Sequence, residues 1–390
     1  MLTEKSSLSW IASGQDRSKV RLPGTNRAVP PADTLAMASR AAGQVGVTRV
    51  ADITRLDTIG IPTFQAIRPL SRTLAVSQGK GVTPELAKLS AVMESVETWH
   101  VEQPMAAVAT AAARDVRDEL TYDVVALPRC VPSVLHDGLP LDWMAARSLI
   151  DGAPTLVPMG MVRLSLEQKT GWNAPVFFES TNGLASGNTL VEGALHALYE
   201  VIERDAMTAA VAGGGEPGVR VDPRSSGSAI VDELCTMIER ADVTLEVRLI
   251  PSPTDLPCFL AWVACDSYPA AMYGFGCHLS PDIALSRAIT EAAQARLAYI
   301  SGARDDLQDN IAEPGTAPRR TPSGPAGDIG DLVPAPVEHD SLVDDLEYVV
   351  KRATAAFSYP PLVVDLTRQD IGVPVVKVVA PGSRVSPEVL

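Results

Sequence analysis

The stretch TLVEGALHALYEVIER (residues 189–204) decides the fold, because it predicts a buried helix with acidic side chains along one face. Thr189 is expected to be the N-cap, with Glu192 three residues later completing a capping box. Polar residues at steps of four, four and three project from one side of this helix: Glu192, His196, Glu200 and Glu203. Apolar residues cover most of the remaining circumference, as in a helix inside a fold. Buried carboxylates need partners, so we expect cations beside this face.

Two other stretches align with this helix without a gap: TPELAKLSAVMESVE (residues 83–97) and SPDIALSRAITEAAQ (residues 280–294). Each begins with a hydroxyl residue at the expected N-cap, and both have proline at the first helical position. Acidic or amide residues fall at equivalent places in the three stretches: Glu94, Glu200 and Glu291, then Glu97, Glu203 and Gln294. Glycines precede every copy. The sequence therefore predicts three related units, each a glycine-rich turn followed by a capped helix, arranged with pseudo-symmetry around one centre.

Composition excludes several classes of function. The chain has 390 residues, of which 46% are hydrophobic, and a net charge of −14 that argues against nucleic acid as the main partner. Its five cysteines show no CxxC pair, which suits a reducing compartment and argues against a zinc site or a disulfide framework. The N-terminal residues lack the long apolar core that a signal peptide has, and no apolar run is long enough to span a membrane. We therefore expect a cytoplasmic protein that does not bind membranes.

Outside the three units the pattern predicts a mixed α/β fold in one domain. Residues 1–25 are expected to be a polar lead-in and residues 26–390 the catalytic domain, with a flexible loop at 301–342 that is rich in Pro, Gly and Asp. Further helices are expected at 33–42, capped by Asp33, at 110–120 and at 230–241. Strands are expected in residues 46–54, 60–67, 70–81, 141–143, 154–159, 176–188, 245–251, 258–266, 270–276, 361–368 and 373–382.

A cluster of acids forms if the three helices meet: Glu94, Glu97, Glu200, Glu203 and Glu291. Two unit charges about 4 Å apart repel by roughly 4 kcal/mol at an effective dielectric constant near 20, so the cluster must be neutralised. Mg²⁺ prefers oxygen ligands and often accompanies phosphates, whereas arginine binds phosphate through two parallel hydrogen bonds. Arg204 and Arg287 lie among these acids. The combination predicts a nucleotide–Mg²⁺ site.

Each of these patterns also has a structural explanation. Glutamates three residues apart on one helix are usually a solvated face, and Arg204 and Arg287 could form structural salt bridges. A histidine such as His196 is more often a satisfied interior residue than a ligand. The glycines of SQGKG (residues 77–81) do not form a P-loop, because the upstream glycine and the final Ser/Thr of that motif are missing. Repetition of the acids in the same register in all three stretches favours the functional explanation.

Three blocks of the chain resemble the signature blocks of the YcaO superfamily: SQGKGVTPELAKLSAVMESVE, STNGLASGNTLVEGALHALYEVIERDA and YGFGCHLSPDIALSRAITEAAQ. The middle block, N-x3-E-x7-E-x2-E-R, is specific, and the resemblance spans nearly the whole chain. It implies a single-domain enzyme that binds ATP and Mg²⁺ without a P-loop and phosphorylates a backbone amide oxygen of a peptide. A nucleophile then adds to the amide carbon and phosphate leaves. A Cys, Ser or Thr side chain gives an azoline, sulfide a thioamide and an amine an amidine.

The resemblance also implies roles for individual residues. Ser90, Glu94 and Glu97 match the first block, although Thr98 stands where arginine often follows; Asn188, Glu192, Glu200, Glu203 and Arg204 match the second, and Arg287, Glu291 and Gln294 the third. Arg27 and Thr34 resemble an early basic residue and hydroxyl near the phosphates. The implied Mg²⁺ ligands are Glu94, Glu200, Glu203 and Glu291. The implied ATP-binding residues are Arg27, Thr34, Ser90, Glu97, Asn188, Glu192, Arg204, Arg287 and Gln294. Glu200, Arg204 and Arg287 are the implied catalytic residues.

Two differences from azoline-forming family members indicate which reaction this chain is expected to catalyse. The chain ends APGSRVSPEVL, without the proline-rich tail of many azoline-forming members, and little sequence precedes the family blocks that could form a leader-binding domain. Two segments resemble the stand-alone or TfuA-associated branch of the family: GVTRVADITRLDTIGIP (residues 46–62) and LAVSQGKG (residues 74–81). The resemblance therefore implies thioamide formation in ribosomal peptide (antibiotic) biosynthesis. The expected partners are a precursor peptide, a TfuA-like protein and a second copy of the chain. Azoline formation, macroamidine formation, a catalytically idle scaffold and a simple nucleotide hydrolase remain alternatives.

Overall fold

The computed structural model describes residues 7–164, 176–214, 216–266, 268–303, 321–387 and 389. The helices are α1 (Pro31–Gln44), α2 (Pro84–Glu102), α3 (Leu190–Ala212), α4 (Ala229–Arg240), α5 (Pro281–Ser301), α6 (Ile329–Leu332) and α7 (Leu342–Phe357). The strands are β1 (Val20–Leu22), β2 (Thr25–Arg27), β3 (Arg49–Asp52), β4 (Thr63–Ile67), β5 (Val76–Lys80), β6 (Ala109–Ala112), β7 (Pro140–Ser148), β8 (Pro154–Pro158), β9 (Leu184–Ser186), β10 (Val219–Val221), β11 (Thr244–Ile250), β12 (Cys258–Cys265), β13 (Tyr268–Cys277), β14 (Leu362–Asp365) and β15 (Val375–Val379). None of the helices among these residues is long and apolar enough to cross a membrane.

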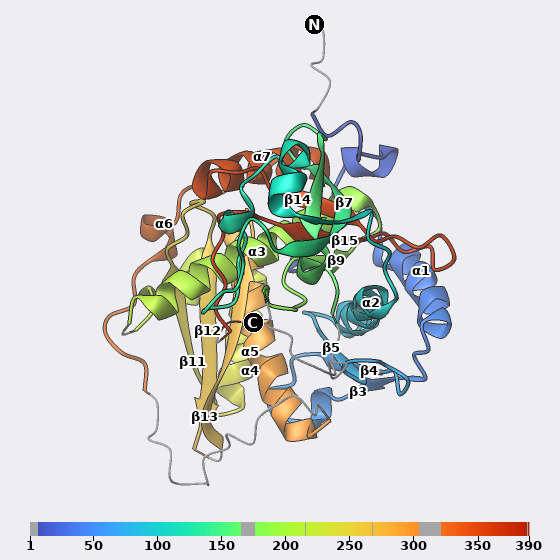
Figure 1. The fold of residues 1–390 in the computed structure, drawn as a ribbon. Helices are drawn as coiled ribbons and strands as arrows, with labels where there is room; N and C mark the ends of the chain where they lie inside the picture. Colours follow the sequence, from blue (N-terminus) through green and yellow to red (C-terminus); the bar gives the residue numbers. More distant parts are fainter. Residues whose placement is uncertain are drawn as a thin grey trace, which may run out of the picture.

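The strands form antiparallel sheets that surround three central helices (Figure 1). One six-stranded sheet has the order β6-β7-β14-β15-β9, with β8 beside β7; a four-stranded sheet has the order β10-β11-β12-β13. A three-stranded sheet, β3-β4-β5, and the β1–β2 hairpin complete the set. Helix α3 packs against β15, β9, β13 and α7, so it joins the two larger sheets, while α5 covers β12 and β13 and α2 covers β4 and β5. The result confirms a mixed α/β fold in one domain.

Each of the three aligned helices follows directly on a strand that lies against it. The pairs are β5 with α2, β9 with α3 and β13 with α5. Glycine allows the strand backbone to touch the helix backbone: a Cβ on Gly79 would lie 2.0 Å from the amide nitrogen of Ala91, and one on Gly276 would lie 2.0 Å from the carbonyl oxygen of Ala284. This close approach explains why glycines precede the helices. The pseudo-symmetry of the three units stays a prediction.

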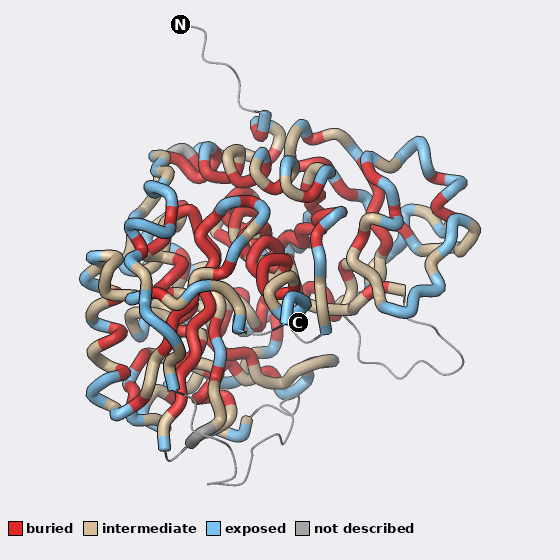
Figure 2. The backbone as a smooth tube through the Cα atoms, turned by 90° about the vertical axis from the view of Figure 1, so that its left-hand side faces the viewer, coloured by how far each residue is buried: buried red, intermediate tan, exposed pale blue. Residues whose placement is uncertain are grey.

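The hydrophobic core has two main parts, and the acid-bearing helix α3 crosses the larger of them. Leu198 and Ile202 of α3 are fully buried there, together with residues of α7 and β15. The second part lies between the four-stranded sheet and helices α4 and α5. Figure 2 shows the buried backbone concentrated along these central elements. Because the helices are fixed on their apolar sides, their remaining polar faces have defined directions.

Most predicted elements are present, and two local predictions about helices are wrong. Asp33 is not a cap, because α1 begins earlier and its N-cap is Pro30. Residues 110–120 do not form an α-helix: β6 pairs with β7, and two short 3₁₀ turns follow. The alanines there favour a helix intrinsically, but pairing with the neighbouring strand overrides that preference. Ser280 is the N-cap of α5, as predicted, although its hydroxyl makes no capping hydrogen bond, unlike those of Thr83 and Thr189.

Three further segments differ from expectation. Helix α7 is not among the helices predicted from the sequence, although Ser341 caps it and its buried residues recur at helical spacing. Only residues 184–186 of the strand expected at 176–188 are extended in a sheet. The polar lead-in packs onto the fold from Leu8, which is fully buried, and Lys19 Nζ lies 2.6 Å from Asp345 Oδ2 of α7. Within the loop expected at 301–342, residues 304–320 lie outside the described residues and 329–332 form α6.

Candidate active site

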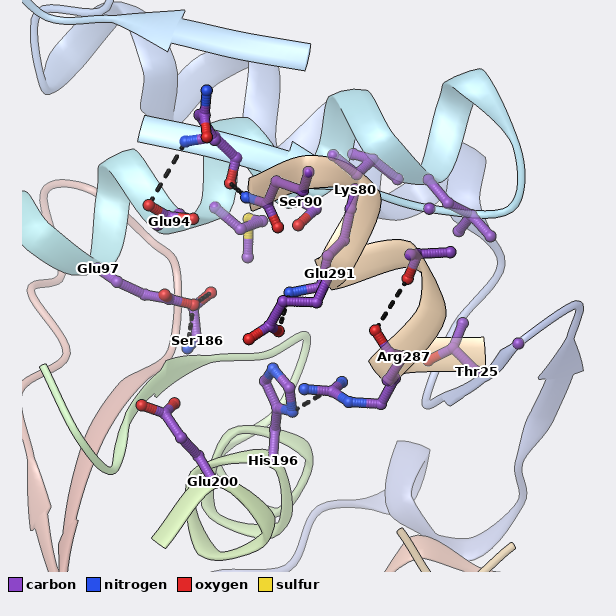
Figure 3. Close-up of a pocket in the computed structure, with 18 of the residues that line it drawn as sticks. Thr25, Lys80, Ser90, Glu94, Glu97, Ser186, His196, Glu200, Arg287 and Glu291 are labelled. Atoms are coloured by element: carbon purple, nitrogen blue, oxygen red, sulfur yellow. Dashed lines mark hydrogen bonds and ion pairs between the residues drawn. The ribbon is translucent and has the colours of Figure 1, made fainter. Parts of the chain in front are cut away.

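A cavity of about 530 Å³ lies where α2, α3 and α5 meet, with β5 and the β1–β2 hairpin completing its wall. It brings together every predicted site residue except Asn188: Arg27, Thr34, Ser90, Glu94, Glu97, Glu192, Glu200, Glu203, Arg204, Arg287, Glu291 and Gln294. Figure 3 shows side chains of the three helices directed toward this common space. Residues more than 200 positions apart in sequence therefore share one site, as the aligned helices predict.

Cationic side chains bridge the carboxylates at the centre of the cavity. Lys80 Nζ lies 2.5 Å from Glu291 Oε2, and Arg204 Nη2 lies 3.8 Å from Glu291 Oε1 and 3.7 Å from Glu203 Oε1. The guanidinium of Arg204 also stacks over the ring of Phe275, at 5.2 Å from its centroid. Buried carboxylates are stable only with such partners, so Lys80 and Arg204 stabilise the acidic cluster in this state of the protein.

Burial makes several of these carboxyl groups hard to ionise. Desolvation raises the pKa of Glu97 to about 8 against two hydrogen bonds from Ser186, whose amide nitrogen and Oγ donate to Glu97 Oε1 at 2.7 and 2.6 Å. Burial likewise raises the pKa of Glu203 to about 7, and it raises the pKa of Glu200. Lys80 and Arg204 outweigh burial at Glu291 and lower its pKa. A cation bound beside such carboxyl groups stabilises their ionised form and lowers their pKa.

A second group of contacts ties the start of α3 to the N-terminal residues. Glu192 Oε2 accepts a hydrogen bond of 2.8 Å from the backbone nitrogen of Ala28, and Arg27 Nε lies 3.6 Å from Glu192 Oε1. Asn188 Nδ2 donates to both oxygens of Glu192, and Thr34 Oγ1 donates to Asn188 Oδ1 at 2.9 Å. The reciprocal half of the predicted capping box is therefore absent: Glu192 binds this group rather than the backbone of its own N-cap. Asn188 itself does not line the cavity, but it is hydrogen-bonded to Thr34 and Glu192, which do.

Several residues that line the cavity or act on its acids are not predicted from the sequence. Lys80 belongs to the SQGKG segment, which does not match the P-loop motif, and Ser186 lies on β9, close before α3 in the chain. Lys377 of β15 is buried, donates to the carbonyl of Ser180 at 2.7 Å, and has a pKa lowered to about 8 by burial despite the opposing charge of Glu200. His196, expected to be a satisfied interior residue, lines the cavity. The signal for Lys80 and Ser186 was their position directly ahead of an acid-bearing helix.

The donor set fits Mg²⁺ together with a polyphosphate. Among the residues that the structure describes, no three His, Cys, Asp or Glu side chains are close enough to hold a metal ion by themselves. The predicted ligands Glu94, Glu200, Glu203 and Glu291 instead surround a space that phosphate oxygens could share with them, as is usual for Mg²⁺. Arg287 Nε and Gln78 Nε2 are buried at this cavity without a hydrogen-bond partner. Unpaired buried donors favour an anionic ligand at the same place.

The raised pKa of Glu97 predicts a pH-dependent stability of the nucleotide-free protein. The folded state holds this proton up to a pH of about 8, whereas the unfolded chain releases it near 4.5, so the free energy of unfolding should fall as pH rises through this interval. The loss is on the order of a few kcal/mol. Denaturant titrations at the two ends of the interval measure it. Glu97→Gln should flatten the dependence, and an unchanged slope in this variant would contradict the assignment.

Comparison with known proteins shows one consistent family. Residues 78–384 match the family model described as YcaO cyclodehydratase, ATP- and Mg²⁺-binding. An uncharacterised protein of Mycobacterium tuberculosis is 40% identical over 368 residues, which cover 92% of this chain and 82% of the relative. A protein of Rhizobium leguminosarum bv. trifolii, described as uncharacterised and in the tfuA 3′ region, is 34% identical over 378 residues, which cover 92% of this chain and 89% of the relative.

Solved structures show the same fold. YcaO from Methanopyrus kandleri, bound with AMPPCP and Mg²⁺, superimposes with a TM-score of 0.75 at 24% identity, covering 94% of both chains. A heterocyclase in complex with substrate and cofactor superimposes with a TM-score of 0.74 at 22% identity, covering 94% of this chain and 54% of the heterocyclase. The Escherichia coli microcin synthetase McbBCD complex with pro-MccB17 bound reaches 0.58 at 14% identity, over 85% and 87% of the two chains. At these identities the likeness concerns the fold alone.

Proposed function

The chain belongs to the YcaO family, and from this premise we propose that it converts a backbone amide of a ribosomally made peptide into a thioamide. Family membership gives the coarser statement directly: the protein is an ATP-dependent, peptide-modifying enzyme with ATP and Mg²⁺ as cofactors, as the sequence predicted. The proposal adds the nucleophile, which is sulfide, and the product.

One observation carries the proposal at the level of the site: acids from α2, α3 and α5 converge with arginines in one cavity. Glu94, Glu200, Glu203 and Glu291 would hold Mg²⁺, which lowers the repulsion between the phosphates and the attacking oxygen. The phosphates would contact Arg27, Arg204 and Arg287, and the nucleotide would be positioned by Thr34, Ser90, Glu97, Asn188, Glu192 and Gln294. An amide oxygen is a weak nucleophile, so positioning and charge neutralisation are the contributions it needs.

Three of these residues would act on the reacting atoms. Arg204 and Arg287 would donate hydrogen bonds to the transferred phosphoryl group, where fixed guanidinium groups stabilise charge without reorganisation. Glu200 lines the same cavity with a raised pKa. A thioamide keeps the N–H of the amide, so the proton that must be removed is the one on the hydrosulfide that adds to the amide carbon before phosphate leaves. We assign Glu200 to the orientation of the peptide amide and to the acceptance of this proton.

Kinship with a protein encoded in the tfuA 3′ region supports the thioamide over other products. The sequence resemblance to the TfuA-associated branch points the same way, and it names a TfuA-like protein as the expected partner beside the precursor peptide. A partner protein can deliver sulfide, which the peptide itself does not supply. The expectations of a homodimer and of a cytoplasmic location stay predictions.

Azoline formation is the second candidate, and the description of the family model as a cyclodehydratase favours it. In that reaction a Cys, Ser or Thr side chain of the peptide attacks the activated amide, and one water is lost from the peptide. Both products require the same activation of the amide oxygen, so the cavity described above serves either of them.

Mass spectrometry of the precursor peptide separates these products. The chain is co-expressed with a candidate precursor peptide and a TfuA-like protein, with Glu203→Gln as the inactive control. Exchange of one oxygen for sulfur supports thioamide formation. Loss of one water would identify an azoline, and exchange of one oxygen for a nitrogen group would identify an amidine. Either result would overturn the proposal. An unmodified peptide together with peptide-independent ATP hydrolysis would identify a nucleotide hydrolase instead.

A further inference from the structure

We propose that His196 is a nucleotide-binding residue that donates a hydrogen bond from Nε2–H to a phosphate oxygen of the bound nucleotide. The inference rests on the proposed function and adds a residue to it. His196 is carried by α3 between Glu192 and Glu200 and lines the central cavity. Figure 3 shows its ring pointing into the space between Glu97, Glu200 and Glu291.

The neighbouring arginine determines which nitrogen of His196 carries the proton. Arg287 Nη1 lies 3.4 Å from His196 Nδ1, in a long hydrogen bond. A guanidinium has donors and no acceptor, so Nδ1 must accept. A neutral imidazole with Nδ1 as acceptor carries its proton on Nε2, which makes Nε2–H the donor. Arg287 thereby fixes both the tautomer and the direction of the ring.

The charges around His196 keep the ring neutral. Burial lowers its pKa well below the usual value, and the positive charges of Arg287, Arg27 and Lys80 lower it further. His278, whose own pKa is also well below the usual value, acts in the same direction. A neutral ring keeps the single-donor state deduced from the geometry.

The same surroundings define the ligand that Nε2–H would meet. Among the residues that the structure describes, none accepts a hydrogen bond from Nε2. Three cations that face the ring, Arg27, Lys80 and Arg287, all line the cavity and attract an anion to its vicinity. The ionised carboxylate of Glu291 lies beside the same space, so an anion bound there needs a counter-ion, which a nucleotide brings with it as Mg²⁺. An oxygen of a Mg²⁺-bound phosphate satisfies both conditions.

Equilibrium binding of a nucleotide series tests this role. Dissociation constants are measured with Mg²⁺ for ATP, ADP, AMP and adenosine, using the wild type, His196→Leu, His196→Gln and His196→Asn. A hydrogen bond to a charged group is worth roughly 1.5 kcal/mol, so His196→Leu should weaken ATP binding by about tenfold. Adenosine binding should not change, and the shortest nucleotide that is weakened identifies the phosphate that is contacted.

The Gln and Asn variants show which nitrogen of the His196 ring matters for ATP binding, the donor Nε2–H or the acceptor Nδ1. The amide nitrogen of Gln can take the place of Nε2–H, so His196→Gln should retain affinity for ATP within about threefold. Asn can accept from Arg287 at the position of Nδ1 but has no group at the position of Nε2, so His196→Asn should bind ATP as weakly as the Leu variant. Rescue by Asn and not by Gln would overturn the proposal and assign His196 to the support of Arg287.

Two further results would also overturn the inference: unchanged ATP affinity in His196→Leu, or an equal loss for all four compounds including adenosine. His100→Gln is a matched control. His100 is a buried histidine of helix α2 that lies outside the cavity, and its Nδ1–H donates a hydrogen bond to the carbonyl oxygen of Val96. Melting temperatures of all variants monitor folding. If the wild type itself fails to bind Mg²⁺–ATP, the proposed function fails. If the wild type binds Mg²⁺–ATP and the His196 variants bind it with the same affinity, only this inference fails.

Discussion

Replacing Glu203 by Gln is expected to lower peptide-dependent ATP turnover by about 10³-fold, which corresponds to roughly 4 kcal/mol of transition-state stabilisation. Glu203 is 4% exposed, and its Oε1 lies 3.7 Å from Arg204 Nη2. Gln keeps the shape of the side chain but supplies no charge to Mg²⁺. Because Arg204 then loses part of its counter-charge, the nucleotide affinity and kcat should fall together. Steady-state kinetics at several Mg²⁺ concentrations measure the effect.

Asp205→Asn is the matched control for Glu203→Gln. Asp205 lies two residues further along α3, is 1% exposed, and accepts hydrogen bonds from Arg384 outside the cavity. Its replacement removes a buried carboxylate charge from the half-exposed guanidinium of Arg384, so it should lower the melting temperature while the folded enzyme keeps its turnover. Equal losses of turnover in the two variants would mean that burial, and not metal binding, explains the importance of Glu203.

Arg287→Lys is expected to lower kcat/KM for ATP by about 10²-fold, although the charge is conserved. Arg287 Nε is buried without a partner and Nη1 reaches His196, so the guanidinium makes few protein contacts and remains available for phosphate. Lysine cannot form two parallel hydrogen bonds to one phosphate, and it reaches the same point with a more strongly hydrated charge. The ATP dependence of the steady-state rate gives the number.

Arg296→Lys provides the comparison on the same helix. Arg296 of α5 pairs with Asp57, with Nε 2.8 Å from Oδ2 and Nη2 3.1 Å from Oδ1, and it does not line the cavity. This substitution should reduce stability and leave the KM for ATP unchanged. If Arg287→Lys behaved in the same way as Arg296→Lys, Arg287 would be a structural residue.

The acid-bearing faces could be predicted from sequence because the information is local. Capping residues, helical spacing and the in-register repetition of acids identify α2, α3 and α5, and the alternating apolar runs identify most strands. The convergence of the three faces is expected from their in-register alignment and predicted pseudo-symmetry, and the need to neutralise the converging carboxylates then indicates Mg²⁺ and arginine as partners. The structure places Glu94, Glu200, Glu203 and Glu291 in one cavity, which agrees with that expectation.

What could not be predicted depends on contacts between distant segments. The bond from Ala28 to Glu192 joins residues 164 positions apart, and that from Lys80 to Glu291 joins residues 211 positions apart. No spacing rule indicates such partners. Residues 110–120 illustrate the same limit, since pairing of β6 with β7 overrides an alanine-rich sequence. Helix α7, by contrast, had a clear local signal in Ser341 and its apolar period, which the sequence analysis did not use.

The position of the metal tests the central claim most directly. Crystals of the wild type grown with Mn²⁺ and a non-hydrolysable ATP analogue would show the metal by its anomalous signal. The account predicts that the metal lies in the cavity between α2, α3 and α5, bound by carboxylates from the set Glu94, Glu200, Glu203 and Glu291 and by phosphate oxygens of the analogue. A metal and nucleotide bound elsewhere on the protein, with these four carboxylates still paired only to Lys80 and Arg204, would contradict it.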